Sequence, residues 1–399
     1  MATLVISNRD ARRYFLYKHA LATRLSPRLE SGDVLSLVRQ LGFVQLDSIN
    51  TVERAHHMIL FSRASGYSRA LLSSLHQERA LFEHWTHDTS LLPIESYPHW
   101  HHRFRASRTP FSHSRWRAFD ENPKKLLAHV RRRIRLEGAL ATRAFDDKRK
   151  GPWWGWGPYK MALEYLFRTG ELAIARRDGF EKVYDLVERV IPAEFRGAKP
   201  TRRQTVNWAC REALAHLGFG TVREIAAFFD LVEIAEARDW VRAALRKKDI
   251  VEITVTNNDE STSSAVAVPF IESDILSLPP SHAPARFLSP FDPVIRDRKR
   301  ALRLFGFDYT IEVFVPEKKR RFGYYVMPII EADRFIGRAD LKAHRTEKRM
   351  EVKGLWPEAQ VVLDRRLTNS IAAAVAELAN FACEAGVVPV PPSEELPLL

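Results

Sequence analysis

The sequence predicts a mainly helical chain with shorter β segments: three tandem winged helices, then a C-terminal antiparallel β-barrel and a helix. Helical periodicity recurs up to about Ala285, and in three places a helix leads through a Gly or Asp turn into a β-type run. A winged helix passes in this way from its recognition helix into its wing. After Ala285 alternating runs replace the helices. The expected domains are therefore 1–118, 119–199, 200–284 and 285–399.

Apolar residues at helical spacing define the predicted helices. In chain order these are Arg12–Leu25, Gly32–Leu41, Leu126–Glu137, Lys160–Arg168, Phe180–Val190, Gln204–Leu217, Thr221–Phe229 and Ile234–Lys247. The turns at Gly42, Gly170 and Asp249 lead into three predicted strands. These strands are Val44–Ile49, Leu172–Arg176 and Val251–Val255. The spacing of the three turns predicts an insertion in the first unit, at about Ser65–Ala118.

The C-terminal region begins after a proline-rich linker at Pro279–Pro284. Its alternating runs predict a small antiparallel sheet or barrel, and they cover Tyr309–Val315, Phe322–Ile330, Phe335–His344 and Arg349–Leu355. The turn Pro316–Arg321 forms a basic hairpin tip in this interpretation. An Ala-rich helix is expected over Leu363–Glu384, followed by a loosely ordered tail at Val387–Leu399.

The charge balance predicts an anionic partner. The 399 residues include 62 Lys and Arg against 49 Asp and Glu, which gives a formal net charge of +13. The surplus is mostly arginine, whose planar fork binds two phosphate oxygens at once. It gathers in three runs, Arg103–Arg135, Arg296–Arg303 and Lys318–Arg321. One such run is more often a solvated face, but three runs on a basic chain favour nucleic acid.

The remaining composition narrows the class of protein. Two cysteines, Cys210 and Cys383, exclude a disulfide scaffold and a cysteine zinc finger, and they suit a reducing cytosol. The apolar stretch Ile371–Cys383 is too short to span a bilayer, and no signal peptide is evident. Glycine patterns that bind nucleotides are also missing from the sequence. We therefore expect a cytoplasmic protein that uses no NTP.

The most informative segment is Phe43–Ile49. The alternation of side chains along a strand puts Gln45 and Asp47 on one face, where the amide and the carboxylate could bind one water molecule. The carboxylate can deprotonate water or stabilise a cation, and the amide can orient the water without titrating. The alternative is that both side chains lie on the exposed polar face of an ordinary wing. The spacing of the two residues alone favours this alternative.

Histidines and tryptophans gather in the first half of the chain. Ten of the fourteen histidines lie between His56 and His129, but no His-Glu-x-x-His motif or nearby cysteine supports a zinc site. Hydrogen bonds to phosphate, to a base or to a pocket carbonyl are more plausible roles, with core or surface positions as the default. The aromatic segment Gly151–Tyr159 is either core packing or a platform for an exposed base.

Several ordered motifs resemble one known family. They are Gly42–Ile49, Val52–His57, Glu83–Asp88 with Ser90–Pro93, Leu288–Pro293 with Arg296–Arg298, and Gly337–Lys342. With these motifs the chain resembles the bacterial winged-helix DNA glycosylases of the YcaQ and AlkZ kind over nearly its whole length. The resemblance implies three winged helices, a C-terminal β-barrel, and a concave basic face that holds duplex DNA. It also implies excision of alkylated bases without a metal or nucleotide cofactor.

The resemblance further implies the site residues. Gln45 and Asp47 are the expected catalytic pair, and a Gln with an Asp resembles the YcaQ branch rather than the double-glutamine AlkZ branch. That branch is associated with unhooking interstrand guanine crosslinks and removing alkylguanine monoadducts. We expect a monomer bound to duplex DNA. The expected DNA contacts are His56, His57, His84, His87, Arg296, Arg298, Lys318, Lys319, Arg320, Arg321 and Arg338.

The expected reaction is hydrolysis by water. Ionised Asp47 would stabilise the oxocarbenium-like sugar and act as general base while Gln45 positions the water. No lysine is a compelling nucleophile, so we predict a monofunctional glycosylase that does not cleave the strand. Two rival interpretations stay open: a non-catalytic winged-helix transcription regulator and a zinc-dependent RNA-processing enzyme.

Overall fold

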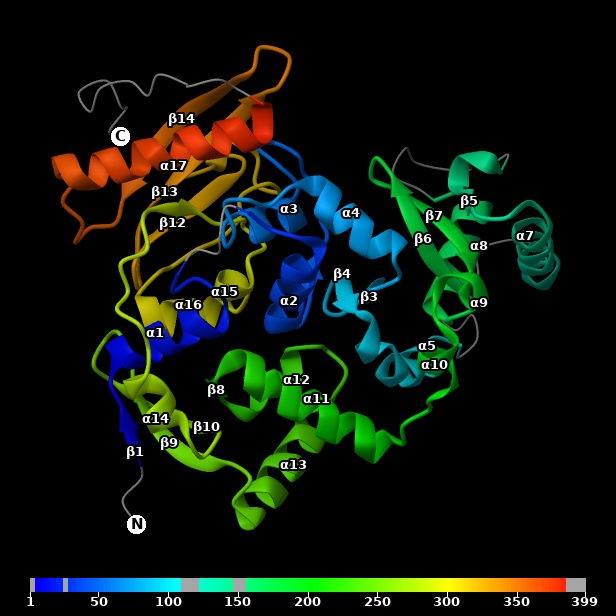
Figure 1. Ribbon diagram of the computed structural model, residues 1–399, viewed down its shortest axis with the longest axis horizontal. Coiled ribbons are helices and arrows are strands. Elements are labelled where there is room, and N and C mark those ends of the chain that lie inside the picture. Colours follow the sequence, from blue (N-terminus) through cyan, green and yellow to red (C-terminus); the bar gives the residue numbers. More distant parts are fainter. Residues whose placement is uncertain (1–3, 24–27, 109–121, 146–155, 385–399) are drawn as a thin grey trace. The chain divides into compact units, whose positions relative to one another are not determined.

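The computed structural model describes residues 4–23, 28–108, 122–145 and 156–384 (Figure 1). The chain divides into two compact units. Unit 1 comprises Met1–Ser68, Cys210–Phe228 and Val232–Leu399, and unit 2 comprises Arg69–Ala209 and Phe229–Leu231. The four-domain division stays a prediction. The predicted tail and most of the aromatic segment Gly151–Tyr159 lie outside the described residues.

The elements of unit 1 come from both ends of the chain. The N-terminal ones are β1 (Leu4–Ile6), α1 (Asn8–Lys18), α2 (Ser31–Leu41), β2 (Val44–Gln45) and α3 (Ala55–Phe61). Helix α11 (Arg202–Leu217) begins in unit 2 and ends in unit 1. It is followed by β8 (Phe219–Gly220), α12 (Val222–Ala227), α13 (Ile234–Lys247), β9 (Val251–Thr256), β10 (Thr262–Ala267) and α14 (Ile271–Leu276).

The first sheet of unit 1 has the strand order β1-β9-β10-β8. Its hairpin β9–β10 is antiparallel, and β1 joins β9 in parallel with Leu4 beside Ile253. The predicted helix at Thr221 begins with a capping box, since Thr221 and Glu224 each accept the other's backbone N–H. The predicted strand at Val251 is confirmed, whereas β1 was not predicted.

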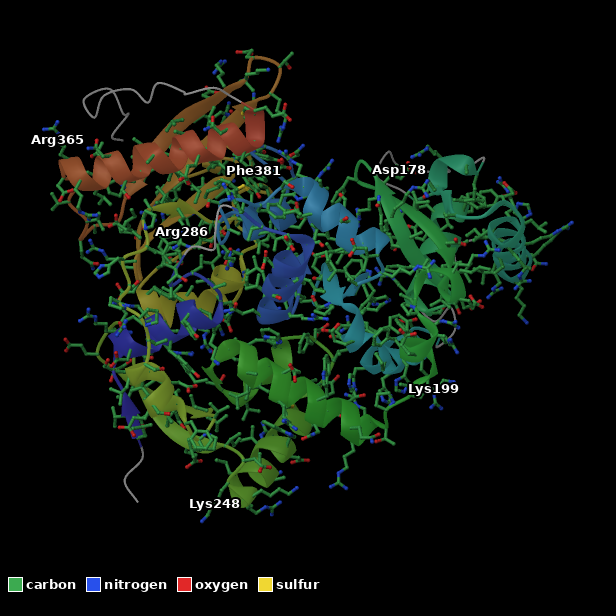
Figure 2. The ribbon with its side chains drawn as sticks, in the orientation of Figure 1. Asp178, Lys199, Lys248, Arg286, Arg365 and Phe381 are labelled. Atoms are coloured by element: carbon green, nitrogen blue, oxygen red, sulfur yellow. The ribbon has the colours of Figure 1, made fainter. Side chains whose placement is uncertain are left out.

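The second sheet of unit 1 lies under the C-terminal helix. It is antiparallel, with the order β11-β12-β13-β14. Its strands are β11 (Arg286–Phe287), β12 (Val326–Glu331), β13 (Arg334–His344) and β14 (Arg349–Pro357). The helices beside it are α15 (Pro293–Arg296), α16 (Arg298–Phe305) and α17 (Arg365–Cys383). Helix α17 runs along the sheet (Figure 1), and Phe381 near its end stacks on Phe61 of α3 with ring centroids 4.3 Å apart (Figure 2).

The predicted strand Tyr309–Val315 is wrong. These residues lie in a loop, where the Tyr309 hydroxyl donates to the carbonyl of Val326 and the backbone turns between Glu312 and Val315. The alternation of apolar and polar residues along this segment therefore reflects the burial of single side chains and not pairing with a neighbouring strand. Among the described residues the sheet has four strands, and no closed barrel is found.

Unit 2 begins with the predicted insertion. Its first elements are α4 (Arg69–Gln77), the hairpin β3 (Leu81–Trp85) and β4 (Thr89–Pro93), the 3-10 helix η1 (Ile94–Trp100) and α5 (His101–Ser107). Next come α7 (Pro123–Glu137), β5 (Leu140–Ala141), η2 (Thr142–Ala144), α8 (Pro158–Arg168), β6 (Leu172–Asp178), β7 (Glu181–Leu186), α9 (Val187–Val190) and α10 (Ala193–Gly197). Strands β5, β7 and β6 form one sheet against α7 and α8.

The predicted helix Phe180–Val190 is wrong over most of its length, and only Val187–Val190 is helical. The rest is mainly strand β7, which pairs with β6 through a two-residue turn at Gly179-Phe180. Gly179 has φ of +63°, a conformation that glycine adopts without the steric cost of a Cβ. A two-residue loop that begins with glycine is a hairpin signal, and it outweighs the helical spacing here. None of the described helices is long and apolar enough to cross a membrane.

Candidate active site

Gln45 and Asp47 lie at the end of a very short strand. Strand β2 ends at Gln45, which is 5% exposed, while Asp47 is half-buried beyond it. The Asp47 carboxylate accepts the backbone N–H of Ile49 at 2.8 Å, a local turn that competes with strand pairing. The predicted strand Val44–Ile49 is therefore too long. Asp47 is oriented by its own turn rather than by strand alternation.

The chain after Asp47 is fixed to strand β13. The amide of Ala343 donates to the carbonyl of Thr51 at 2.9 Å. The guanidinium of Arg345 donates to the Asn50 side chain at 2.9 Å and to the Val52 carbonyl at 2.5 Å. A mobile carboxylate would lose orientation, so these bonds help to hold the segment that carries Asp47. Sequence analysis missed Arg345, because nothing local in the sequence marks a partner almost 300 positions away.

A buried phenol lies near Asp47. Tyr325 is 0% exposed, and burial raises the pKa of its hydroxyl, with further contributions from the charges of Asp47 and Glu53. Tyr325 is therefore neutral at ordinary pH. Glu53 is itself 4% exposed and accepts the backbone N–H of Arg54 at 2.8 Å. The charges of Asp47 and Glu53 thus both act on this phenol, and negative charge at such a site would suit a substrate that develops positive charge.

Tyr325 ends a loop, residues 306–325, that we call the basic loop. The carboxylate of Glu312 accepts three successive backbone N–H groups, those of Arg321, Phe322 and Gly323, at 2.9–3.1 Å. Burial opposes ionisation, but these amides lower the pKa of Glu312. Lys318, Lys319 and Arg321 are exposed, and the 3-10 turn η3 (Glu317–Lys319) takes the place of the expected hairpin tip.

A second carboxylate holds the end of the basic loop. Asp340 on β13 accepts the backbone N–H groups of Tyr324 and Tyr325, although burial raises the pKa of this carboxyl. Gly323 has φ of +142°, and a Cβ there would lie 2.1 Å from an oxygen of Asp340. Only glycine permits this approach. Five consecutive amides of the loop are thus bound by two carboxylates, and sequence analysis missed both.

Three arginines expected to contact DNA have partners within unit 1. Arg338 is 8% exposed, pairs with Glu358 at 2.6 Å, and stacks on two phenylalanine rings. Arg296 donates to the carbonyl of Phe228 at 2.9 Å. The guanidinium of Arg298 lies 4.5 Å from the ring centre of Tyr309. These contacts stabilise the fold, so we do not include the three arginines among the proposed DNA contacts.

Two further arginines of the second basic run share one carboxylate within unit 1, whereas Lys299 is exposed. Arg300 is 1% exposed and donates to Glu224 at 3.1 Å, and Arg303 donates to the same carboxylate at 2.7 Å. Charge in the sequence therefore does not mean charge on the surface. Of the sites inferred from the basic runs, the four cations of the basic loop are the strongest candidates for phosphate contacts.

The four histidines expected to contact DNA differ in environment. His84 is 3% exposed between Phe104 and Phe167, and burial lowers its pKa to about 3. It belongs to the core of unit 2, and we do not propose it as a DNA contact. His87 is exposed at the turn of the β3–β4 hairpin.

His56 and His57 lie on α3, with ring centroids 4.1 Å apart. His56 is 6% exposed, and Nδ1 of His57 lies 2.7 Å from the hydroxyl of Tyr67. Their positions suit a supporting role in unit 1 better than direct contact with phosphate. Within the described residues, no group of three or more His, Cys, Asp or Glu side chains is arranged to hold a metal ion.

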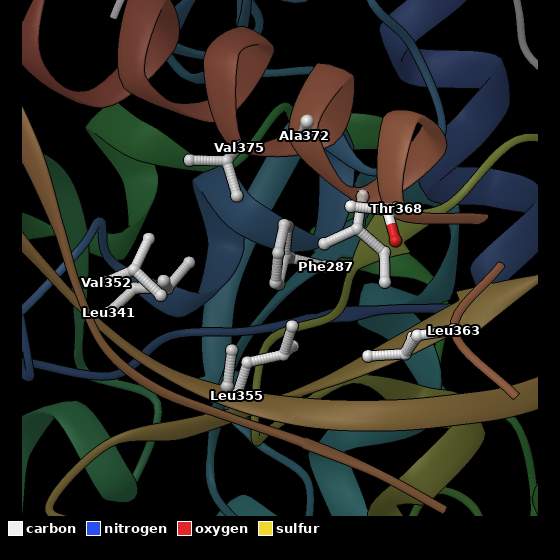
Figure 3. A pocket seen from close by; sticks show the side chains of 10 residues that line it. Phe287, Leu341, Val352, Leu355, Leu363, Thr368, Ala372 and Val375 are labelled. Carbon is white, nitrogen blue, oxygen red and sulfur yellow. The ribbon is translucent and has the colours of Figure 1, made fainter. Parts of the chain in front are cut away.

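A cavity in unit 1 lies between α17 and the second sheet (Figure 3). Phe287, Leu341 and Leu355 face Val375 across it, and Thr368 supplies the one hydroxyl among its lining side chains. A binding pocket needs several convergent polar groups in addition to apolar walls. This cavity is therefore a packing defect of the core and not the candidate active site.

Comparison with known proteins defines the class. Residues 38–381 match the family model described as DNA glycosylase AlkZ-like. The chain belongs to this family and is a DNA glycosylase, which confirms the resemblance seen in the sequence.

One solved structure illustrates the fold. The Streptomyces sahachiroi DNA glycosylase AlkZ matches with a TM-score of 0.62 at 15% identity, covering 97% of this chain and 99% of that one. At this identity the likeness shows a shared fold.

Proposed function

We propose that this DNA glycosylase hydrolyses the N-glycosidic bond of cationic alkylated guanine, and that it both unhooks interstrand crosslinks and removes monoadducts. The observation that carries the proposal is the half-buried Asp47, two residues after Gln45: the charge of Asp47 acts together with that of buried Glu53 on the buried phenol of Tyr325. A carboxylate held in a negative environment favours a transition state in which the sugar becomes positive.

The chemistry follows from the leaving group. Alkylation at the seven-position nitrogen makes guanine cationic, which weakens the glycosidic bond before the enzyme acts. Asp47 is open enough to meet solvent, so it can stabilise the sugar and accept a proton from water while Gln45 orients that water. The charge of Glu53 also acts on Tyr325, and the neutral phenol itself adds no charge to the site. A tethered base cannot easily turn into a closed pocket, so an open site suits crosslinks.

The proposed DNA contacts are His87 and the four cations of the basic loop, Lys318–Arg321. Two segments support a winged-helix interpretation, because each orders a helix, a short strand, a further helix and a hairpin. These segments are α7–β5–α8–β6–β7 and α11–β8–α12–α13–β9–β10. Exposed cations supply affinity through phosphate contacts and carry no sequence information themselves.

Asp47→Asn tests the catalytic assignment. Excision from duplex DNA containing alkylguanine is expected to fall about a hundredfold or more, since one electrostatic group of a site is removed. Duplex binding should stay near normal, because Asp47 is not a phosphate contact. Single-turnover excision and a binding titration measure the two quantities.

Asp239→Asn is the matched control, since it removes an exposed carboxylate of α13. It should excise at the wild-type rate. Full excision activity of Asp47→Asn would contradict the catalytic assignment. A wild-type protein that binds mustard-treated duplex but excises nothing, with or without chelator, would favour the regulator alternative instead.

A further inference from the structure

The basic loop carries a phenylalanine that is almost fully exposed. Phe314 has 91% of its surface accessible, the largest fraction among the exposed large hydrophobic side chains of the described chain. Exposed apolar surface costs free energy in water, roughly 25 cal/mol per Å². Lys318, Lys319 and Arg321 are exposed on the same loop, and they outnumber its exposed carboxylates, Asp308 and Glu317. An apolar ring among cations fits a partner that offers both phosphates and stacked rings.

The loop holds Phe314 in a defined turn. The amide of Val315 donates to the carbonyl of Glu312 at 2.9 Å, so Phe314 lies inside a closed four-residue turn. Nε of Arg320 donates to the carbonyl of Val315 at 2.9 Å. The carboxylate of Glu312 meanwhile holds the amides that follow Arg320. Glu312 thus fixes both the aromatic turn and the basic run, which lowers the entropy lost on binding.

We propose that Phe314 is an apolar wedge that inserts between adjacent base pairs of duplex DNA. Proteins that bend DNA insert such side chains at base steps while nearby cations contact the backbone. The inference rests on the proposed function, since it assumes that the basic loop meets the duplex. Tyr325 at the foot of the loop interacts electrostatically with Asp47, which puts this end of the loop near the candidate catalytic carboxylate. Unstacking near the lesion would help to expose the target sugar.

A second exposed phenylalanine provides a contrast. Phe270 is 72% exposed at the start of α14, but Glu272 and Asp274 follow it in the first helical turn. Carboxylates repel phosphate, so Phe270 does not meet the requirement for charge complementarity. It is therefore the matched control for Phe314.

The test uses duplexes that carry 2-aminopurine beside an alkylguanine analogue resistant to excision. Wild-type protein should raise the 2-aminopurine fluorescence, because that base brightens when it loses a stacked neighbour. Phe314→Ala should abolish most of the rise and weaken duplex binding by about tenfold, within the range for loss of one stacked aromatic group. Phe314→Trp should retain the rise, and Phe270→Ala should match wild type in both measurements.

The salt dependence of binding separates a wedge from a damaged loop. Phe314→Ala removes no charge, so the slope of log affinity against log salt should equal that of wild type. A lower slope would mean that the cations had moved, and it would overturn the wedge. The wedge would also be overturned if Phe314→Ala showed the fluorescence rise and the duplex affinity of wild type. These outcomes are independent of excision by Asp47→Asn, so either proposal can fail alone.

Discussion

Arg63 and Asp292 form a fully buried ion pair in unit 1. Both side chains are 0% exposed, and two parallel bonds of 2.5 and 2.9 Å join the guanidinium to the carboxylate. Asp292 also accepts the backbone N–H of Val294 and so begins α15. Arg63 donates further to the carbonyl of His19. The motif Leu288–Pro293 thus has a structural role, because its aspartate connects α3 to α15.

Asp292→Asn should destabilise the protein by about 3–5 kcal/mol. It leaves the Arg63 guanidinium buried without its counter-charge, and breaking a buried pair on one side costs that much. Urea unfolding followed by tryptophan fluorescence measures the loss. Asp239→Asn breaks the exposed pair with Arg242 and should leave the free energy of unfolding unchanged within error. Equal stabilities for both variants would contradict this role for Asp292.

At the residue scale, sequence alone identifies some groups and misses others. Gln45 and Asp47 are candidates because they are near neighbours within one motif. Tyr325 and Arg345 join that segment only through the fold, across almost 300 positions. Arg338 illustrates the opposite error, since an arginine in a motif can equally contact DNA or form an ion pair within the fold, as Arg338 does with Glu358. Long-range packing determines such roles, and one sequence does not reveal it.

At the scale of elements, helix α8 and strand β7 are joined by a buried charge cluster. Glu164 on α8 accepts hydrogen bonds from Lys182 at 3.0 Å and from the hydroxyl of Tyr184 at 2.7 Å, and it pairs with Lys160 at 3.2 Å. Burial alone would raise the pKa of Glu164, but Lys182, Lys160 and Tyr184 together lower it to about 2. The ionised carboxylate therefore stabilises the folded state.

This cluster predicts a specific pH dependence. A carboxyl whose folded pKa lies below the unfolded value contributes stability above about pH 4.5, and loses it as the pH falls towards 2. Between pH 4.5 and 3 wild type should lose about 1–2 kcal/mol more than Glu164→Gln, in which this group no longer titrates. Urea unfolding at pH 7, 4.5 and 3 provides the comparison.

Glu78→Gln, at an exposed carboxylate of unit 2, should retain the wild-type pH dependence. If Glu164→Gln also kept the wild-type pH dependence, Glu164 would not be the group responsible.

The same region shows why the prediction of secondary structure fails locally. Strand β7 has spacing compatible with a helix, and only the Gly179-Phe180 turn and pairing with β6 decide the outcome.

At the scale of the whole molecule, the net charge of +13 predicts the sign of the partner but not the binding surface. Many of the arginines are used inside the fold. Arg131 pairs with Glu171, and Arg300 and Arg303 share Glu224. The helices and strands that follow regular periodicity were largely predictable from sequence. The charged side chains that stay on the surface could not be predicted, because each depends on partners that are distant in the chain.

Replacing Lys318 and Lys319 together by Ala tests where the useful charge lies. Each phosphate contact contributes about 0.9 to the slope of log affinity against log salt on duplex DNA, so the slope should fall by nearly 2. Arg133→Ala with Arg366→Ala is the charge-matched control, because half-buried Arg133 and exposed Arg366 already pair with Glu137 and Glu331. Both double variants reduce the net charge equally. If they reduced the salt slope equally, affinity would depend on total charge and not on the basic loop. We expect the loss only in the loop variant, since a counterion is released where a free cation meets a phosphate.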